Sequence, residues 1–304
     1  MISALLPIFT ETVLPVFLVA AAGVLLATLL KVDHRTLGRT VFYLGTPSLI
    51  FRSLYTTQFD WATLRLLATV AASVMVTTGL ISWLLSAGLS RRERAAVVLT
   101  SAMSNNGNMG MPICHFAFGE AGLALAAIYY ITVSFLGNTL GIVVASSGRM
   151  SLPAAFREAL KAPMLYAAVL GLLFNRMQWE LPTALFRSID LLADAAIPLM
   201  LIVLGVQLRT NFKWHSPALV FRSVAIRLLI GPLVAWGICR LLGVTQVEQS
   251  VMIIQSSMPT AVITSVVATE FDAAPELVAT DIFVSTLLSM VSLSFILWLV
   301  MTPP

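Results

Sequence analysis

Charged residues are scarce in this chain. Of its 304 residues only 11% are Asp, Glu, Lys or Arg, whereas 59% belong to the apolar set. Soluble domains carry roughly 25% charged residues and could not cover their surface with so few polar groups. The composition therefore excludes a water-soluble enzyme and predicts an integral membrane protein surrounded by lipid.

Cysteine is scarce as well. Cys114 and Cys239 stand alone in apolar surroundings and form no CxxC pair, so the sequence indicates neither a disulfide framework nor a metal site. We expect no cofactor. The 18 basic residues outnumber the 14 acidic ones, but they occur in short clusters between apolar runs. That pattern indicates membrane topology and no binding of nucleic acid.

Ten apolar segments approach the roughly 20 residues that a helix needs to cross a bilayer. Six carry few or no charges: 12–30, 66–89, 95–118, 122–147, 249–269 and 277–301. The other four, which charged residues interrupt or flank, are 36–56, 163–178, 185–208 and 217–241. The sequence thus predicts an all-α membrane protein of ten transmembrane helices, called spans 1 to 10 below in chain order.

The basic residues are distributed unevenly over the connections between spans. The odd connections hold 12 of them: Lys31, Arg35, Arg39, Arg91, Arg92, Arg94, Arg149, Arg157, Lys161, Arg209, Lys213 and Arg222. The opposite side holds five: Arg52, Arg65, Arg176, Arg187 and Arg240. The positive-inside rule makes the odd connections cytoplasmic, so we expect both termini on the extracytoplasmic side of the cell membrane.

The two halves of the chain resemble each other. ERAAVVLTSAMSN, from residue 93, matches EQSVMIIQSSMPT 155 positions later, and FGEAG, from residue 118, matches FDAAP 153 positions later. Pro47 and Pro198 form a third pair. Apolar strings also match by chance, but three matches nearly in register favour a repeat. Five spans per half would invert the second copy, as in many secondary transporters. We expect inverted repeats at 1–150 and 151–304.

Spans 4 and 9 contain residues that helices tolerate poorly. SNNGNMGMPI, residues 104–113, has three Asn, two Gly and one Pro, and SSMPTA, residues 256–261, stands at the matching place in the second half. Gly costs about 1 kcal/mol and Pro about 3 kcal/mol in a helix interior. We therefore expect two broken helices that cross at their breaks. The structural alternative is a pair of kinks between tightly packed helices.

The direction of the spans favours an anion at this crossing. The second halves of both helices would begin near the bilayer centre, one within 104–112 and one near Pro259, since Pro suits a first helical turn. Helix starts present free N–H groups and about half a positive charge. Span 5 has no carboxylate from Ala121 through Ala145, although a buried cation needs a counter-charge.

Polar and small residues around the two breaks are the candidate substrate-binding residues. Asn amides can donate hydrogen bonds to a carboxylate without adding a fixed charge. Asn138 on span 5 suits either a ligand contact or helix packing equally well. The candidates are Asn105, Asn106, Asn108, Gly110, Pro112, Asn138, Ser257, Met258, Pro259 and Thr260. No catalytic or metal-binding residue is predicted.

Four ionisable residues fall within spans or at their ends. A lone charged side chain at the middle of the bilayer costs at least about 2.5 kcal/mol. We therefore expect Arg227 and Asp281 to form a structural pair, with a functional relay as the alternative. Asp190 and Asp194 lie four apart on one helix face, and we expect them in the outer headgroup region. A proton site is the alternative there.

The broken spans carry a family resemblance. SNNGNMGMPI, IIQSSMPTAVITSVVATEF and AAIPLMLIVLGVQL resemble the corresponding stretches of the auxin efflux carrier family, which includes plant PIN carriers and bacterial permeases for small carboxylates. The resemblance implies the ten-helix fold of the bile acid sodium symporters. Spans 1, 2, 6 and 7 would form a scaffold, and spans 3–5 and 8–10 a mobile transport domain that moves as an elevator. It also implies substrate at the crossing, beside Asn105 and the crossover proline Pro259.

The chain departs from the plant carriers in three places. Ser104 stands where they have a second crossover proline, and their long cytoplasmic loop after span 5 is absent. They have an Asp and a Lys four apart at the start of span 3, whereas Asp60 and Arg65 are five apart and better suit an interfacial pair.

The leading hypothesis is a secondary transporter of a small organic anion. The expected substrate is a carboxylate, and auxin-like carboxylates belong to this class. A sodium-coupled symporter is the nearest alternative, with Gln255 or Glu270 and carbonyls at the breaks as cation ligands. A channel would need a ring of subunits or a continuous polar pore, and an intramembrane aspartyl protease would need its two Asp on separate helices. A homodimer through the scaffold helices is an assembly that this architecture allows.

Overall fold

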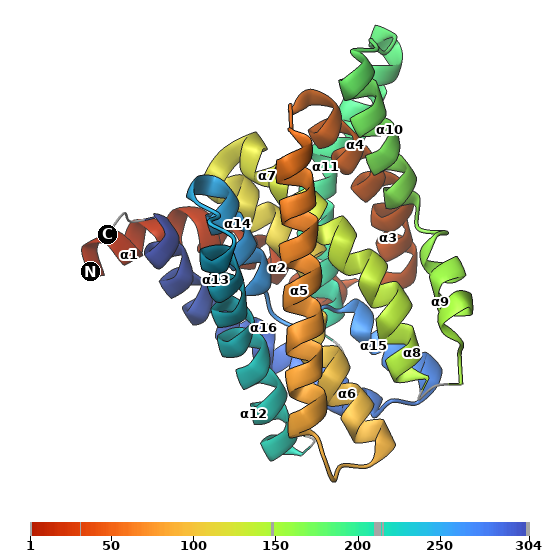
Figure 1. The fold of residues 1–304 in the computed structure, drawn as a ribbon, viewed down its shortest axis with the longest axis vertical. Coiled ribbons are helices and arrows are strands. Elements are labelled where there is room, and N and C mark those ends of the chain that lie inside the picture. The colour runs from red at the N-terminus through yellow and green to blue at the C-terminus, as the bar shows by residue number, and fades with distance from the viewer. Residues whose placement is uncertain (1, 31, 147–148, 210–213, 215, 302–304) are drawn as a thin grey trace.

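The computed structural model describes residues 2–30, 32–146, 149–209, 214 and 216–301 (Figure 1). Within these ranges the chain is all-helical, and its only β-type pairing is an isolated antiparallel bridge between Ser104 and Thr260. Lys31 and Lys213, two of the basic residues counted for topology, lie outside the described residues, as does residue 147 at the end of span 5. The helical architecture agrees with an integral membrane protein, because helices satisfy their backbone groups internally.

Six helices in the described ranges are long and apolar enough to cross a membrane: Leu5–Leu29, Trp61–Leu85, Asn106–Ala145, Thr183–Leu208, Pro217–Leu241 and Pro275–Met301. Predicted span 2 corresponds to the uninterrupted run of α3, η2 and α4, which is not among these six, and other predicted spans consist of shorter helices. Residues 163–178 correspond to one helix of 15 residues, and residues 249–269 to helices of 11 and 9 residues.

Within the described residues, the first half of the chain contains twelve helical elements, among them π-helical turns labelled η. They are α1 (Ile2–Ile8), η1 (Phe9–Val13), α2 (Leu14–Leu29), α3 (His34–Thr40), η2 (Val41–Gly45), α4 (Thr46–Thr56), α5 (Trp61–Leu85), α6 (Arg91–Ala102), η3 (Asn106–Gly110), α7 (Met111–Leu136), η4 (Gly137–Gly141) and α8 (Ile142–Ala145). α7 is interrupted by a kink at Gly119, where φ is 63°, a value that glycine adopts without strain. Its two parts thus belong to predicted spans 4 and 5.

The described part of the second half contains nine elements. They are α9 (Leu152–Ala159), α10 (Pro163–Met177), α11 (Thr183–Leu208), α12 (Pro217–Ala225), η5 (Ile226–Ile230), α13 (Gly231–Leu241), α14 (Gln246–Ser256), α15 (Ile263–Phe271) and α16 (Pro275–Met301). Spans 4 and 9 are broken here as the sequence predicts, between α6 and η3 and between α14 and α15.

Two helices begin earlier than their predicted spans because polar side chains cap them. The Asp60 carboxylate accepts the backbone N–H of Thr63 at 2.7 Å, so α5 begins at Trp61 and not at 66. Ser90 and Glu93 form a reciprocal capping box that starts α6 at Arg91 and not at 95.

Close backbone contacts join helices of predicted spans 1 and 7. A Cβ at Gly23 in α2 would overlap the carbonyl of Ile202 in α11, and one at Gly205 would overlap the carbonyl of Ala20. In predicted spans 2 and 6, the Asn175 amide of α10 donates to the carbonyl of Tyr55 in α4 at 2.6 Å. Small residues and interhelical hydrogen bonds of this kind hold helices together in lipid.

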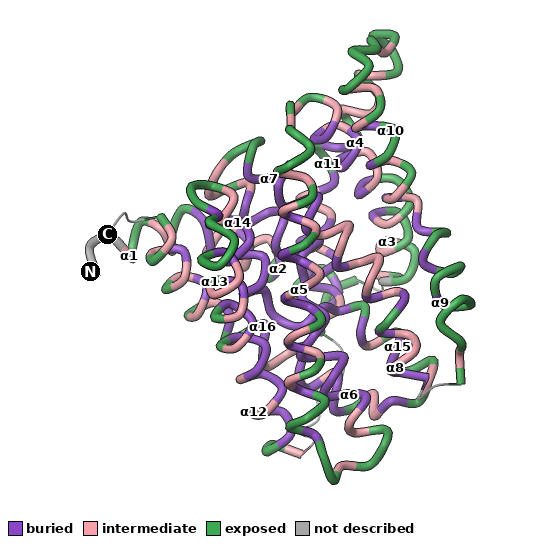
Figure 2. The backbone as a smooth tube through the Cα atoms, in the orientation of Figure 1, coloured by how far each residue is buried: buried purple, intermediate pink, exposed green. Residues whose placement is uncertain are grey.

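Buried residues gather in the middle of the bundle and exposed ones on its outer rim (Figure 2). The rim is apolar: Phe221, with 76% of its surface exposed, and Val291, with 74%, face outward. Such surfaces suit a lipid environment. In Figure 1 the α4–α5 and α10–α11 connections lie at the upper end, and the α5–α6 connection and the start of α12 at the lower end.

Candidate functional site

The two broken helices meet at their breaks. The backbone N–H of Asn105 donates to the carbonyl of Pro259 at 2.8 Å, and that of Ala261 donates to the carbonyl of Met103 at 2.9 Å. Breaking a helix within a membrane frees backbone groups that must find partners inside the protein. Here each break supplies partners for the other, so the crossing is a packed two-stranded contact.

The helices resume at different distances from their prolines. η3 begins at Asn106, and Pro112 follows within the continuous helix, at the start of α7. α15 begins only at Ile263, after residues 257–262 have passed through the crossing without belonging to a helix. The helix start expected near Pro259 lies at Ile263, so Pro259 does not stand in a first helical turn but in the bridge, where its carbonyl accepts the backbone N–H of Asn105.

Asn105 carries an unpartnered donor at the crossing. The residue is only 5% exposed, and its side-chain nitrogen Nδ2 is buried without a hydrogen-bond partner within the described ranges. Buried polar groups almost always have a partner, and an orphaned donor costs about 1–3 kcal/mol. The Asn105 amide is therefore free to bind a ligand acceptor.

Asn106, by contrast, is fully used inside the protein. Its Nδ2 donates to both the carbonyl and the side-chain Oε1 of Gln255, each at 2.7 Å, and its Oδ1 accepts the Ser104 hydroxyl at 2.6 Å. Gln255 is completely buried, and a Cβ at Gly110 would overlap its Oε1. The sequence alone offered Gln255 only as a cation ligand; it links the two broken helices.

The polar candidates on span 9 are also engaged. The Ser257 hydroxyl donates to the carbonyl of Ile253 at 2.6 Å, and that of Thr260 donates to the carbonyl of Thr100 at 2.9 Å. The backbone N–H of Thr260 donates to the Ser285 hydroxyl at 3.1 Å. Met258 and Pro259 are buried beside them.

Asn108 and Asn138 are the remaining amides. Both are partly exposed, and neither side chain has a hydrogen bond within the part of the chain that the structure describes. Asn138 belongs to η4, and a Cβ at the adjacent Gly137 would lie 2.7 Å from the Met103 side chain. Span 5 therefore passes close to the first break.

Arg227 and Asp281 do not pair. The Nη1 of Arg227 donates to the carbonyls of Ser101 at 2.8 Å and Ala102 at 3.3 Å, and its Nη2 donates to the carbonyl of Ser256. Asp281 instead accepts the Ser223 hydroxyl at 2.6 Å. The predicted pair is wrong because the last carbonyls of α6 and α14 lack helical partners and accept the guanidinium.

Asp190 and Asp194 of α11 share a partner that the sequence did not indicate. Arg52 of α4 donates to Asp190 at 3.0 Å and to Asp194. This ion pair joins predicted spans 2 and 7. Asp60 and Arg65 do not contact each other: the Arg65 guanidinium donates to the carbonyl of Trp61 at 3.2 Å.

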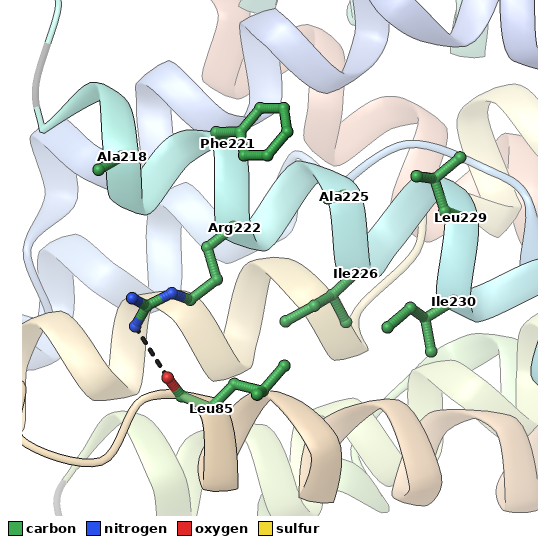
Figure 3. A pocket seen from close by; sticks show the side chains of 8 residues that line it. All are labelled: Leu85, Ala218, Phe221, Arg222, Ala225, Ile226, Leu229 and Ile230. Atoms are coloured by element: carbon green, nitrogen blue, oxygen red, sulfur yellow. Dashed lines mark hydrogen bonds between the residues drawn. The ribbon is translucent and has the colours of Figure 1, made fainter.

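An outward groove lies between the end of α5 and the helix formed by α12 and η5 (Figure 3). Its lining is Leu85, Ala218, Phe221, Arg222, Ala225, Ile226, Leu229 and Ile230, and Arg222 donates to the carbonyl of Leu85 at 2.8 Å. The groove contains none of the candidate residues, and its exposed Phe221 and Leu229 suit contact with lipid.

Comparisons with known proteins extend over nearly the whole chain. Residues 8–297 match the family described as "Membrane transport protein". An uncharacterized transporter of Methanothermobacter thermautotrophicus is 35% identical over 293 residues, which cover 93% of this chain and 96% of the relative.

Two further relatives carry more specific names. A "Putative malonate transporter" of Rhizobium meliloti is 26% identical over 311 residues, 96% of this chain and 95% of the relative. Auxin efflux carrier component 2 of Oryza sativa subsp. japonica is 24% identical over 148 residues, 47% of this chain and 24% of that protein. The chain therefore belongs to the membrane transport protein family, which includes the auxin efflux carriers, and it is a membrane transporter and not an enzyme.

Proposed function

We propose that this protein is a secondary transporter that moves a small carboxylate across the cell membrane, with the substrate bound where spans 4 and 9 cross. The observation that carries the proposal is the buried amide of Asn105, whose Nδ2 has no partner within the described ranges. The relative named as a malonate transporter, similar over 96% of this chain, supports the substrate class.

The electrostatics of the crossing favour an anion. The helix that begins with η3 starts beside Asn105, and α15 starts just after the second break, so two helix starts direct partial positive charge toward this region. Asn108 and Asn138 add amides without hydrogen bonds elsewhere in the described chain. In this proposal Asn105 donates to a carboxylate oxygen, and Gly110, Pro112, Ser257, Met258, Pro259 and Thr260 form the surrounding wall.

Asn106 takes a different part from the one that the sequence suggests. Its amide is occupied by Gln255, so we assign it to holding the crossing together and not to direct substrate contact. The same contact uses the Oε1 of Gln255, which the sodium-coupled alternative would need, and Glu270 is exposed. The uncoupled or proton-coupled carrier is therefore the better-supported version.

The proposed architecture has ten spans in two inverted repeats, 1–150 and 151–304. Each repeat would contribute one broken helix, and their mutual bridge at Asn105 and Pro259 supports this arrangement. α1 and the end of α16 lie together at one side of the bundle (Figure 1), which supports termini on the same side of the membrane. Both are proposed to be extracytoplasmic.

We further propose an elevator-type movement. Spans 1, 2, 6 and 7 would form the scaffold, supported by the close contact of α2 with α11 and by the Asn175–Tyr55 hydrogen bond between α10 and α4. Spans 3–5 and 8–10 would form the transport domain, whose two broken helices are joined by backbone hydrogen bonds and would move as one body.

The test is ligand binding by the purified protein, followed by transport. Malonate and other small carboxylates should raise the unfolding temperature, because a ligand at about 100 times its Kd adds roughly 2.7 kcal/mol to the stability of the native state. Saturable uptake into proteoliposomes that is stimulated by internal carboxylate would distinguish a carrier from a channel. Stabilisation by organic cations but by no carboxylate would contradict the proposal, and a strict sodium requirement would favour the symporter.

A further inference from the structure

Arg227 joins the first halves of both broken helices. Its side chain leaves the π-helical turn η5 and donates to the last carbonyls of two different helices: Ser101 and Ala102 at the end of α6, and Ser256 at the end of α14. One guanidinium thus binds both helix ends just before their breaks. The planar guanidinium fork holds its donors in a fixed geometry that suits this task, whereas a lysine ammonium is a compact point charge on a flexible stem.

The charge of Arg227 is buried without a carboxylate partner. The residue is 1% exposed, and no Asp or Glu forms an ion pair with it in the described ranges. Asp281 is completely buried as well, but its Oδ2 accepts the Ser223 hydroxyl, one turn earlier on the helix that carries Arg227. Backbone carbonyls are therefore the groups that stabilise this cation.

These carbonyls carry the negative ends of two helix dipoles. Each helix C-terminus is equivalent to about half a negative charge, so the ends of α6 and α14 together present about one. A single guanidinium between them offsets that charge. The carbonyl ends then no longer offset the positive ends of the helices that follow the breaks, and Asn105 lies three residues beyond Ala102 in the sequence.

We propose that Arg227 is the positioning residue that fixes the two breaks against each other and makes the crossing selective for anions. This inference rests on the proposed transport function and adds the group that sets the sign of the substrate charge. Without Arg227, the carbonyl ends of α6 and α14 would repel an anion about as strongly as the following helix starts attract it.

The surroundings of Arg227 are shaped to hold it. Gly231 begins α13 close to the guanidinium, and a Cβ there would lie 2.5 Å from Nη2 and 2.8 Å from the carbonyl oxygen of Ser256. The preceding turn η5 is π-helical, a local widening that is often found at functional sites. A side chain at 231 would separate Arg227 from the end of α14.

The test compares probes of different charge on variants of matched arginines. Malonate carries two negative charges, and monomethyl malonate has a similar shape with one. In Arg227→Gln the Kd for malonate should rise by a factor about tenfold larger than the factor by which the Kd for monomethyl malonate rises. Arg227→Lys, which keeps the charge but loses the fork, should fall between wild type and Arg227→Gln.

Arg222→Gln is the control. Arg222 lies on the same helix and also donates to a backbone carbonyl, that of Leu85, but it does so at the outward groove (Figure 3) and away from the breaks. Its removal should leave the ratio of the two affinities unchanged. If the ratio of the two affinities is the same in Arg227→Gln as in wild type, the inference is overturned while the transport proposal stands. If Arg227→Gln does not fold, the ratio measured for Arg227→Lys decides.

A second readout needs no ligand. The amide hydrogens of Asn105 and Ala261 bridge the breaks, and they should exchange at least about tenfold faster in Arg227→Gln or Arg227→Lys than in wild type, with Arg222→Gln unchanged. If the wild-type protein binds neither probe, that result rejects the proposal of a carboxylate substrate but does not test the positioning role of Arg227. In that case unchanged exchange in the Arg227 variants would overturn the positioning role, and accelerated exchange would support it.

Discussion

The backbone N–H of Asn105 lies 2.8 Å from the carbonyl oxygen of Pro259, to which it donates a hydrogen bond. The two residues come from opposite halves of the chain and from the breaks of two different helices. Because the backbone of Asn105 is fixed in this way, its side-chain amide is held at the crossing, although the amide itself has no partner in the described protein. Asn105 thus has a fixed position and a free donor.

Asn105→Ala should weaken malonate binding by about 10- to 100-fold, because a hydrogen bond to a charged group contributes about 1.5–3 kcal/mol. The unfolding temperature without ligand should stay near the wild-type value, since the side chain has no internal hydrogen bond to lose. Calorimetric titration and thermal unfolding check the two halves of this prediction. Wild-type affinity in a folded Asn105→Ala protein would move the site away from the crossing.

Asn108→Asp should bind malonate more weakly than Asn108→Ala. Asn108 is partly exposed beside the break, and a carboxylate there would repel an anionic ligand, whereas alanine would only remove a donor. The comparison of both Kd values at low and high ionic strength is the measurement. Repulsion between charges is largest at low ionic strength. Equal Kd values of the two variants under that condition would show that position 108 faces away from the ligand.

Asn106 and Gln255 should be coupled in stability. Asn106→Ala and Gln255→Ala should each lower the free energy of unfolding by about 1–3 kcal/mol, because each leaves a buried polar partner unsatisfied. The double variant should cost less than the sum of the two single changes. Thermal or denaturant unfolding of all four proteins gives the coupling energy, and strictly additive losses would mean that the amides do not interact.

Gly231→Ala should destabilise the protein and disturb the crossing, while Gly237→Ala should not. Both glycines lie in α13, but a Cβ at 231 would meet Arg227 and the Ser256 carbonyl, and one at 237 would have nothing within 4 Å. We expect a loss of roughly 1–3 kcal/mol at 231 and a gain of about 0.4–1 kcal/mol at 237. Equal unfolding temperatures for the two variants would contradict the close packing around Arg227.

Cysteines at positions 151 and 180 should be labelled from opposite sides of the membrane. Ser151 and Glu180 are exposed and flank the segment that contains α10, and the native Cys114 and Cys239 are buried and should give little background. An impermeant maleimide should label Glu180→Cys in intact cells and Ser151→Cys only after permeabilisation. Labelling of both from one side would exclude α10 as a membrane crossing, and reversed sides would invert the proposed orientation.

Much of the architecture follows from local sequence. Long apolar runs dictate helices in lipid, because no other conformation satisfies the backbone there. The Asn, Gly and Pro residues of SNNGNMGMPI and the Pro of SSMPTA dictate where two of those helices break. Both effects depend on a residue and its near neighbours, so they can be predicted without knowing which helices touch.

Partner choice could not be predicted in this way. Asn105 and Asn106 are adjacent and chemically identical, yet one amide is free and the other is saturated by Gln255. Arg227 and Asp281 looked like a charge pair by depth, but the guanidinium binds three backbone carbonyls and the carboxylate accepts a hydroxyl. Sequence determined which groups are available in this protein; the packing of helices from both halves decided which of them meet, because a hydrogen bond requires its atoms within about 3 Å and in line.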